Sequence, residues 1–261
     1  MSGKRMLRFA LVCALVLAWM LAGSGCFSLA LFPRHVTLYT TLSATPDAQQ
    51  VYRIEIANMT FTNSENVAIN IVYSDAPSVE AVVSRDLLDY GFAITVRNGI
   101  LRVAPARALN IQTERFELTI HALFNEVDLS GGYEVAIDAN GAPGALALNV
   151  SGAASGSVNN LYGSDFEARI SGAGMFTLYG AVDRASLHIS GAGSIEGAGL
   201  ICNALEAKIS GAGDMVISVV DELEAKVSGI GSIEYYGAPV VTQFISGLGS
   251  VSQKSEHFPG A

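Results

Sequence analysis

The sequence predicts an all-β fold, a parallel β-helix (β-solenoid) with 18–20 residues per rung and Ser-Gly-x-Gly corners. Three observations predict it. A Ser-Gly pair recurs at a nearly constant spacing, and the residues before each pair alternate between apolar and polar. In addition, 22 of the 27 glycines lie at or after Gly131, where the repeat is visible.

The Ser-Gly pairs set the period of the repeat. They are separated by 20, 19, 20, 18 and 18 residues and begin at Ser151, Ser171, Ser190, Ser210, Ser228 and Ser246. A fixed period of this length is typical of a solenoid, in which each repeat packs only against its neighbours. Helices are disfavoured, because glycine at this density would break them.

The residues before each pair predict β-strands. Apolar and charged residues alternate in the segment 205–209, Leu-Glu-Ala-Lys-Ile, and similar segments precede the other pairs. A period of two indicates a strand with one buried face. We therefore expect Ile209 to face the core and Lys208 to face water. One apolar position after each corner is expected to stack as a ladder of Phe176, Ile195, Met215, Ile233 and Val251.

The glycines of the Ser-Gly-x-Gly corners are expected to supply positive φ angles, which other residues resist. A phosphate-binding glycine loop would need a helix after the motif, whereas strands are predicted after every copy. A calcium-binding solenoid would need an Asp at a fixed offset, and only Asp214 directly follows a copy. The motif is therefore predicted to be architectural, with no cofactor and no metal.

Residues 37–252 are predicted to form a single β-solenoid domain. Up to residue 150 the pattern is less regular, and these strands are expected to be wider rungs or paired strands of the same solenoid. Residues 253–261 are predicted to be a polar C-terminal tail that caps the last rung, with Phe258 folded over its apolar end. Charges and proline, as in this tail, blunt an open strand edge.

Residues 1–25 have the form of an export leader. Three basic residues precede an uncharged stretch, residues 9–32, whose apolar core ends in small side chains just before Cys26. Cys26 resembles the lipidated cysteine of a bacterial lipoprotein, with residues 26–36 as a short tether. Two alternatives stay open: an uncleaved membrane anchor, since about 20 apolar residues span a bilayer, and cleavage after Ala30 that releases a soluble protein. All three export the body of the chain.

Charge and cysteine content exclude some classes of function. The formal net charge is −9, and no basic cluster follows the leader, so nucleic acid is not an expected partner. Cys202 is the single cysteine after Cys26, which leaves no intramolecular disulfide in the body. Cys202 follows two apolar residues and is expected to be a buried, inert thiol.

No catalytic residues are predicted. The four histidines are far apart in the sequence and have no cysteine or carboxylate at metal-ligand spacing. Tyr179, Tyr235 and Tyr236 are predicted to follow corners on neighbouring rungs and are the candidate binding surface, because outward aromatic rings accept sugar rings or protein side chains. The alternative is that Tyr235 fills the core while Tyr236 covers a corner.

The order of these motifs resembles a known family. The succession from ISGAGMFTLYGAV to YYGAPVVTQFISGLGSV, with FAITVRNGILRVAP upstream, is similar to the head GIN domain family of putative auto-transporter adhesins. The likeness runs from about residue 50 to residue 252. It implies a β-solenoid at the bacterial envelope or surface, and it transfers no catalytic residue.

These observations together predict an exported, membrane-tethered, non-catalytic protein with an adhesin-like binding or scaffolding role at the cell envelope. Its expected partners are the membrane, through a lipid or an N-terminal anchor, and a glycan or protein ligand at the surface. One alternative is a carbohydrate-active enzyme, a polysaccharide lyase or hydrolase, which would require three or more acidic side chains converging in a groove. The other is a purely structural envelope spacer.

Overall fold

The computed structural model describes residues 39–44, 51–142 and 144–255. The leader (1–25), Cys26, the tether (26–36) and Phe258 therefore lie outside the described residues. The described residues belong to one compact unit, Thr37–Ala261. Its elements are β1 (Tyr39–Ala44), β2 (Arg53–Phe61), β3 (Val67–Tyr73), β4 (Ser78–Ser84), α2 (Arg85–Asp89), β5 (Ala93–Arg97), β6 (Ile100–Ala104), β7 (Leu109–Ile111), β8 (Phe116–Ala122), β9 (Glu126–Gly132), β10 (Glu134–Asp138), β11 (Ala145–Val150), β12 (Ser155–Ile170), β13 (Ala173–Ile189), β14 (Ala192–Ile209), β15 (Ala212–Val227), β16 (Ile230–Tyr236), β17 (Val240–Ile245) and β18 (Leu248–Gln253).

The strands wind into a β-solenoid with two flat faces, and its regular part makes about six turns. We call face A the face formed by β9, β11, the second halves of β12 to β15, and β17. Face B is formed by β10, the first halves of β12 to β15, β16 and β18. The long strands β12 to β15 continue from face B into face A, so all 18 strands belong to one coiled sheet. The predicted solenoid is confirmed.

The register of the rungs confirms the predicted alternation. Phe176 pairs with Ile195, which pairs with Met215, and the ladder continues through Ile233 to Val251. The first four of these side chains are buried, and Val251 on the last rung is half-buried. On face A, Ile209 is buried and Lys208 is exposed. Period-two hydrophobicity therefore fixes which side chains make the core between the two faces.

The explanation expected for the corner glycines is wrong for all of them except Gly231: no first glycine of a corner has a positive φ, and among the second glycines only Gly231 has one. The reason for glycine is close approach between rungs. A Cβ on Gly211 would lie 2.0 Å from the carbonyl oxygen of Gly191 on the rung before. The equivalent distance is 1.9–2.2 Å for the first glycine of all six corners, namely Gly152, Gly172, Gly191, Gly211, Gly229 and Gly247.

The N-terminal part of the solenoid is not stacked in sequence order. In face A, β2 lies between β6 and β9, and in face B, β3 lies between β8 and β10, all with parallel pairing. The rung made by β2 and β3 is thus inserted between two rungs that follow it in the chain. Both expected forms, rungs and paired strands, occur in this part of the chain.

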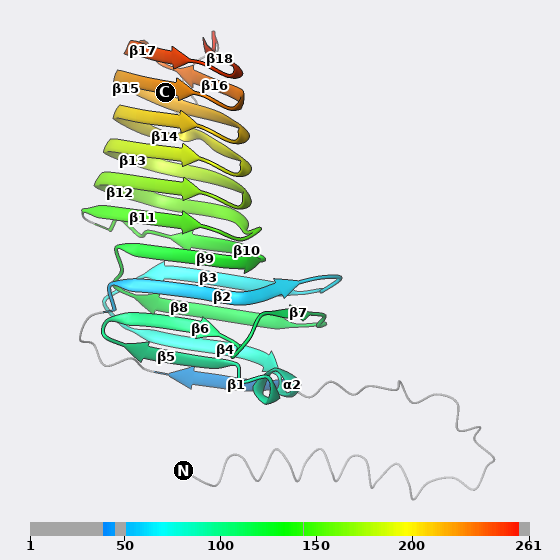
Figure 1. Cartoon of the computed structure of the whole chain (residues 1–261). Helices are drawn as coiled ribbons and strands as arrows, with labels where there is room; N and C mark the ends of the chain where they lie inside the picture. Colours follow the sequence, from blue (N-terminus) through cyan, green and yellow to red (C-terminus); the bar gives the residue numbers. More distant parts are fainter. Residues whose placement is uncertain (1–38, 45–50, 143, 256–261) are drawn as a thin grey trace, which may run out of the picture. The chain divides into compact units, whose positions relative to one another are not determined.

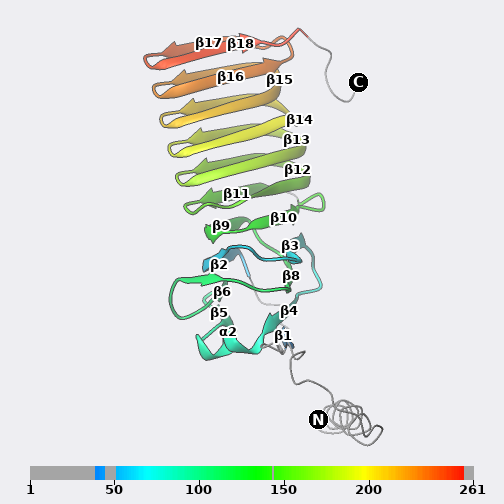
Figure 2. The same cartoon turned by 90° about the vertical axis from the view of Figure 1, so that its right-hand side faces the viewer.

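Antiparallel strands close this end of the stack. β5 pairs antiparallel with β6, β4 pairs antiparallel with β8, and β1 pairs antiparallel with β4. Figures 1 and 2 both show β1, β5 and α2 at one end of the solenoid and β17 with β18 at the other. The parallel stack therefore ends in a different way at each end.

Cys202 is a buried free thiol, as expected. Its sulfhydryl donates to the carbonyl oxygen of Ser218 at 3.2 Å, and burial raises the pKa of the thiol to about 12. The neighbouring Ser218 is also buried, and its hydroxyl donates to the carbonyl oxygen of Ala198 at 2.8 Å. A thiol that stays protonated at neutral pH is a poor nucleophile, which agrees with a packing role.

Candidate binding face

The outward side chains of face A form two rows that run along the solenoid axis. The strands are in register, so equivalent positions of successive rungs lie side by side, about 4.8 Å apart. The first row is mainly acidic and consists of Glu167, Ser186, Glu206, Glu224 and Thr242. The second row begins with four basic residues and consists of Arg169, His188, Lys208, Lys226 and Phe244.

A shallow groove of about 980 Å³ crosses face A from β11 to β17. Its polar walls come from two sets of outward side chains. One set is the acidic row, and the other lies two residues before that row on each strand and includes Asp165, Arg184 and Glu222. Carboxylates, a guanidinium and hydroxyls therefore line one continuous surface. The charged residues of the groove are Asp165, Glu167, Arg184, Glu206, Glu222 and Glu224.

Ion pairs connect successive rungs across the groove. The ammonium group of Lys226 lies 2.6 Å from a carboxylate oxygen of Glu224 and 3.3 Å from one of Glu206. The hydrogen bond to Glu224 is the main reason that the pKa of Lys226 is raised. Arg184 lies 2.8 Å from Asp165, and a hydrogen bond from Ser164, followed by that from Arg184, lowers the pKa of the Asp165 carboxyl.

His188 lies in the middle of the basic row. It is half-buried, rather than fully solvated, and its Nε2 lies 3.3 Å from the hydroxyl oxygen of Ser210. Burial lowers the pKa of His188, and the neighbouring charges of Lys208 and Arg169 lower it further, whereas Glu206 acts in the opposite direction. The imidazole is therefore held neutral to a lower pH than a free histidine.

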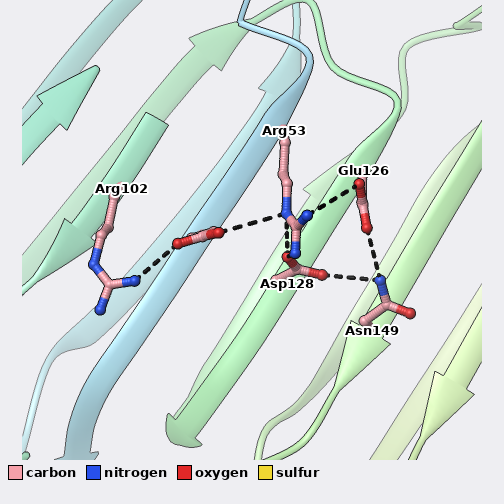
Figure 3. Close-up of polar contacts among 6 residues, drawn as sticks. Arg53, Arg102, Glu126, Asp128 and Asn149 are labelled. Atoms are coloured by element: carbon pink, nitrogen blue, oxygen red, sulfur yellow. Dashed lines mark hydrogen bonds and ion pairs between the residues drawn. The ribbon is translucent and has the colours of Figure 1, made fainter. Parts of the chain in front are cut away.

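Face A continues toward the N-terminal end as a network centred on Arg53 (Figure 3). Arg53 donates to Asp128 and lies 3.7 Å from Glu126 on β9 and 3.5 Å from Glu55 on its own strand. Burial acts to lower the pKa of Arg53, but the hydrogen bond and charge of Asp128, with the other two carboxylates, raise it overall.

Two further residues extend this network to the outer strands. Arg102 on β6 lies 2.8 Å from Glu55, and the side-chain amide of Asn149 on β11 donates to Glu126 at 3.1 Å and to Asp128 at 2.9 Å. The network thus joins β6, β2, β9 and β11, where a rung is inserted out of sequence order. Its partners are all protein groups, and its evident role is to hold these strands in register.

The three tyrosines do not form one outward platform. Tyr236 is only 9% exposed, with the ammonium group of Lys254 5.8 Å from its ring centre, and Tyr235 is half-buried against the core. Tyr179 is 50% exposed, and its ring covers Gly199. Two rungs, those of β14 and β15, separate Tyr179 on β13 from Tyr235 on β16, so the expectation of neighbouring rungs is wrong.

The groove was not predicted from the sequence, because the aromatic residues, rather than the outward charges, indicated a binding surface. The outward charges of face A were visible in the alternation, but their assembly into one surface depends on the register between rungs 18 to 20 residues apart. Within residues 39–44, 51–142 and 144–255, no group of three or more His, Cys, Asp or Glu side chains has the arrangement to hold a metal ion. In the same ranges, no helix is long and apolar enough to cross a membrane.

The fold and face A define the class of protein: a two-faced β-solenoid with an ion-paired groove along one face. The chain belongs to the family described as putative auto-transporter adhesin, head GIN domain, whose model matches residues 60–239. No curated protein matches the chain.

Solved structures of low sequence identity share the fold. A putative adhesin from Bacteroides fragilis is 20% identical with a TM-score of 0.70, and the match covers 83% of this chain and 97% of that one. A putative adhesin from Parabacteroides distasonis is 23% identical with a TM-score of 0.58, covering 84% and 98%. A putative lipid binding protein from the same species is 22% identical with a TM-score of 0.55, covering 83% and 97%.

Proposed function

We propose that this protein is an exported, non-catalytic binding protein of the cell envelope that holds an extended polar ligand, a glycan chain or a protein segment, in the groove of face A. The observation that carries the proposal is the groove itself, which runs across six stacked strands and is lined by carboxylates, a guanidinium and hydroxyls. Such groups hydrogen-bond the hydroxyls and amides of an elongated ligand.

The proposed location at the envelope is supported by the family, which is described as putative auto-transporter adhesin. The proposed tether is the N-terminal leader, with lipidation at Cys26 favoured over an uncleaved helix or soluble release. The support for lipidation is the apolar stretch that ends in small residues directly before the cysteine. Lipidation would keep the solenoid at the membrane surface, where a surface ligand is available.

A carbohydrate-active enzyme is the second candidate, and one observation favours it: five carboxylates line the groove. The geometry of Glu206 and Glu224 argues against catalysis by this pair. Both lie beside the ammonium group of Lys226, at 3.3 Å and 2.6 Å. A pair of catalytic carboxylates instead needs the glycosidic bond, or an attacking water, between its two members.

The binding proposal is tested with residues 37–261, the compact unit. Solved relatives consist almost entirely of the matched region, up to 98% of their chains, so this region folds without another domain. The fragment is screened against arrays of glycans and of matrix proteins, and against phospholipid vesicles because one relative is described as a putative lipid binding protein. We expect a glycan or protein hit.

The groove variant is Glu206→Lys/Glu224→Lys, and the matched control is Glu196→Lys, an exposed carboxylate on face B of β14. Binding should be lost in the groove variant and kept in the control. Equal loss in both would contradict the groove as the site, and no binding in any array would favour a structural spacer. Release of new reducing ends from a polysaccharide hit would establish the enzyme instead.

A further inference from the structure

The last rung of the solenoid, β17 with β18, is an open end. Within the described part of the chain, β17 pairs in register only with β15, and β18 pairs in register only with β16. Both strands therefore present a row of unpaired backbone N–H and C=O groups on their outer side (Figures 1 and 2). A strand edge of this kind accepts another strand unless something blocks it.

Apolar side chains are exposed at this end of the solenoid, and one of them occupies a core position that no further rung covers. Ile245 is 44% exposed, whereas Val227, the residue with which it pairs on the rung before, is 1% exposed. Leu248, Val240 and Phe244, at outward-facing positions of the last rung, are also among the most exposed large apolar residues of the described chain. The open end thus combines unpaired backbone groups with an uncovered core side chain and outward apolar side chains.

The last rung also lacks the charges that natural edge strands carry. No charged residue occurs from Tyr235 to Gln253. On the preceding rungs, the position of Phe244 is occupied by Arg169, His188, Lys208 and Lys226, and that of Val240 by Asp165, Arg184, Ala204 and Glu222. The position of Phe244 thus carries a basic residue on every rung from β12 to β15 and loses it only at the last rung, whereas an exposed edge is normally protected by charge.

The described part of the C-terminal tail does not cover the edge. The backbone N–H of Lys254 donates to the carbonyl oxygen of Tyr235 at 2.8 Å, and its ammonium group lies 2.7 Å from Glu234. Both contacts are with β16, the strand beside β18 in face B, rather than with the open side of the last rung. The ammonium group of Lys254 is therefore directed back toward the solenoid.

We propose that the open end of β17 and β18 is a self-association surface, at which two copies of this chain meet in a closed, head-to-head dimer. Within the last rung, β17 and β18 run in opposite directions on the two faces. A two-fold axis perpendicular to the solenoid axis brings the last rung of a second copy against this one, and each strand then faces a strand that runs antiparallel to it. The occupant must be strand-like, uncharged and as wide as a rung, and the last rung of another copy meets all three conditions.

Head-to-tail growth is disfavoured by the other end of the solenoid. There β5 and β4 cover the last parallel strands in antiparallel orientation, and α2 and Arg97 supply charge. The assembly therefore closes as a dimer and does not extend into a fibre.

The dimer has a functional consequence that rests on the proposed N-terminal tether. β1 lies at the end of the solenoid opposite β17 and β18 (Figure 1), so the first strands of the two copies lie at the far ends of the dimer. With each copy tethered through its leader, the contact joins molecules anchored in two facing membranes. The second copy is then itself the adhesive partner.

The test measures the mass of the 37–261 fragment by light scattering over a wide range of concentration. We expect a monomer–dimer equilibrium. The variant Val240→Lys/Phe244→Lys places two cations at exposed positions of the last rung and should weaken the dimer at least about tenfold, because like charges then meet across the axis. The control Ala204→Lys puts lysine at the matching position of β14, on the same strand as Lys208, and should leave the dimer intact.

Further measurements check that the variants fold, that the two copies meet head to head, and that residues 256–261 are not the group bound at the open end. Thermal unfolding of both variants checks that they fold. Spin labels at Ser252→Cys should give a short inter-chain distance, and labels at Arg97→Cys should give none. Deletion of residues 256–261 should leave the dimer unchanged.

Several results would overturn the proposal. The fragment could stay monomeric at every concentration, form dimers only after deletion of residues 256–261, or grow into assemblies larger than a dimer. Equal weakening of the dimer by Val240→Lys/Phe244→Lys and by the control Ala204→Lys would also overturn it. Beads coated through residue 37 should aggregate, and beads that stay dispersed although the fragment dimerises would overturn the bridging role. Glu206→Lys/Glu224→Lys should leave the dimer unchanged, so failure of groove binding and failure of the dimer are separate outcomes.

Discussion

Substitution of Gly211 by alanine tests the reason for the Ser-Gly corners. A Cβ at this position would lie 2.0 Å from the carbonyl oxygen of Gly191 and 2.4 Å from that of Ser190. An ordinary contact needs more than 3 Å, so the rungs would have to separate by about 1 Å at this corner. Backbone strands on both sides are held by other rungs and cannot shift freely.

The expected cost follows from these contacts. Overpacking costs about 1–3 kcal/mol. Separation of the rungs also strains the corner hydrogen bonds from Ala212 N–H to Gly191 and from Ile230 N–H to Gly211, both 2.9 Å long, and each is worth about 1 kcal/mol. We therefore expect Gly211→Ala to lower the free energy of unfolding by about 2–4 kcal/mol, which lowers Tm by roughly 4–16 °C in a domain of this size.

Thermal and urea unfolding of the 37–261 fragment measure this effect. Two controls add one heavy atom without a severe contact with the preceding rung. Gly197→Ala adds a Cβ whose nearest neighbour is 3.2 Å away, and Ala212→Ser changes an exposed corner residue next to Gly211. Both should change Tm by only a few degrees. Equal stability of Gly211→Ala and the wild type, or equal loss in Gly197→Ala, would refute close approach as the reason for glycine.

Three further predictions concern the core, the tether and His188. Ile209→Asp should prevent folding or sharply lower Tm, because burial of this side chain contributes about 1.5–3 kcal/mol, whereas Lys208→Asp should have little effect; similar Tm values for both would contradict the strand register. Cys26→Ser, expressed in a bacterium, should abolish labelling by a fatty-acid probe, and unchanged labelling would exclude lipidation at this residue. The folded-state pKa of His188 is below its unfolded value, so its contribution to stability should be present above about pH 6.5 and decline as the pH falls through the folded pKa; NMR titration should show this pKa rising in Lys208→Gln, and no rise would contradict the assigned charge interaction.

The repeat and the alternation predicted the solenoid because both are local in the sequence. The side-chain direction of a strand changes with every residue, so the position of Ile209 relative to Lys208 requires no knowledge of the neighbouring rung. The fixed spacing of the Ser-Gly pairs then implies stacking in register, since only then do equivalent residues meet. The same reasoning predicted the ladder from Phe176 to Val251, which the strand pairing confirms.

The candidate site was not predicted, because it depends on which rungs are neighbours and how they are aligned. Lys226 joins Glu224 on its own strand to Glu206, 20 residues earlier, and only the register brings the second carboxylate within reach. At least one ring of the pair Tyr235 and Tyr236 was expected to face outward; Tyr235 is half-buried, and Tyr236 is buried beside Lys254. Their adjacent positions predict that the two rings point to opposite sides of the strand, but they do not say which ring is buried.

The sequence by itself determined the class of fold, the rung length, the side chains of the core and the sites of the corners. Only the tertiary structure decided that β2 and β3 are inserted between later rungs, that corner glycines avoid contact with the carbonyl oxygens of the preceding rung, and that charge rows form a groove on face A. The physical reason is the range of the interactions. Alternation and glycine content act within a few residues, whereas rung order and side-by-side pairing are set by contacts between residues 18 to 75 positions apart.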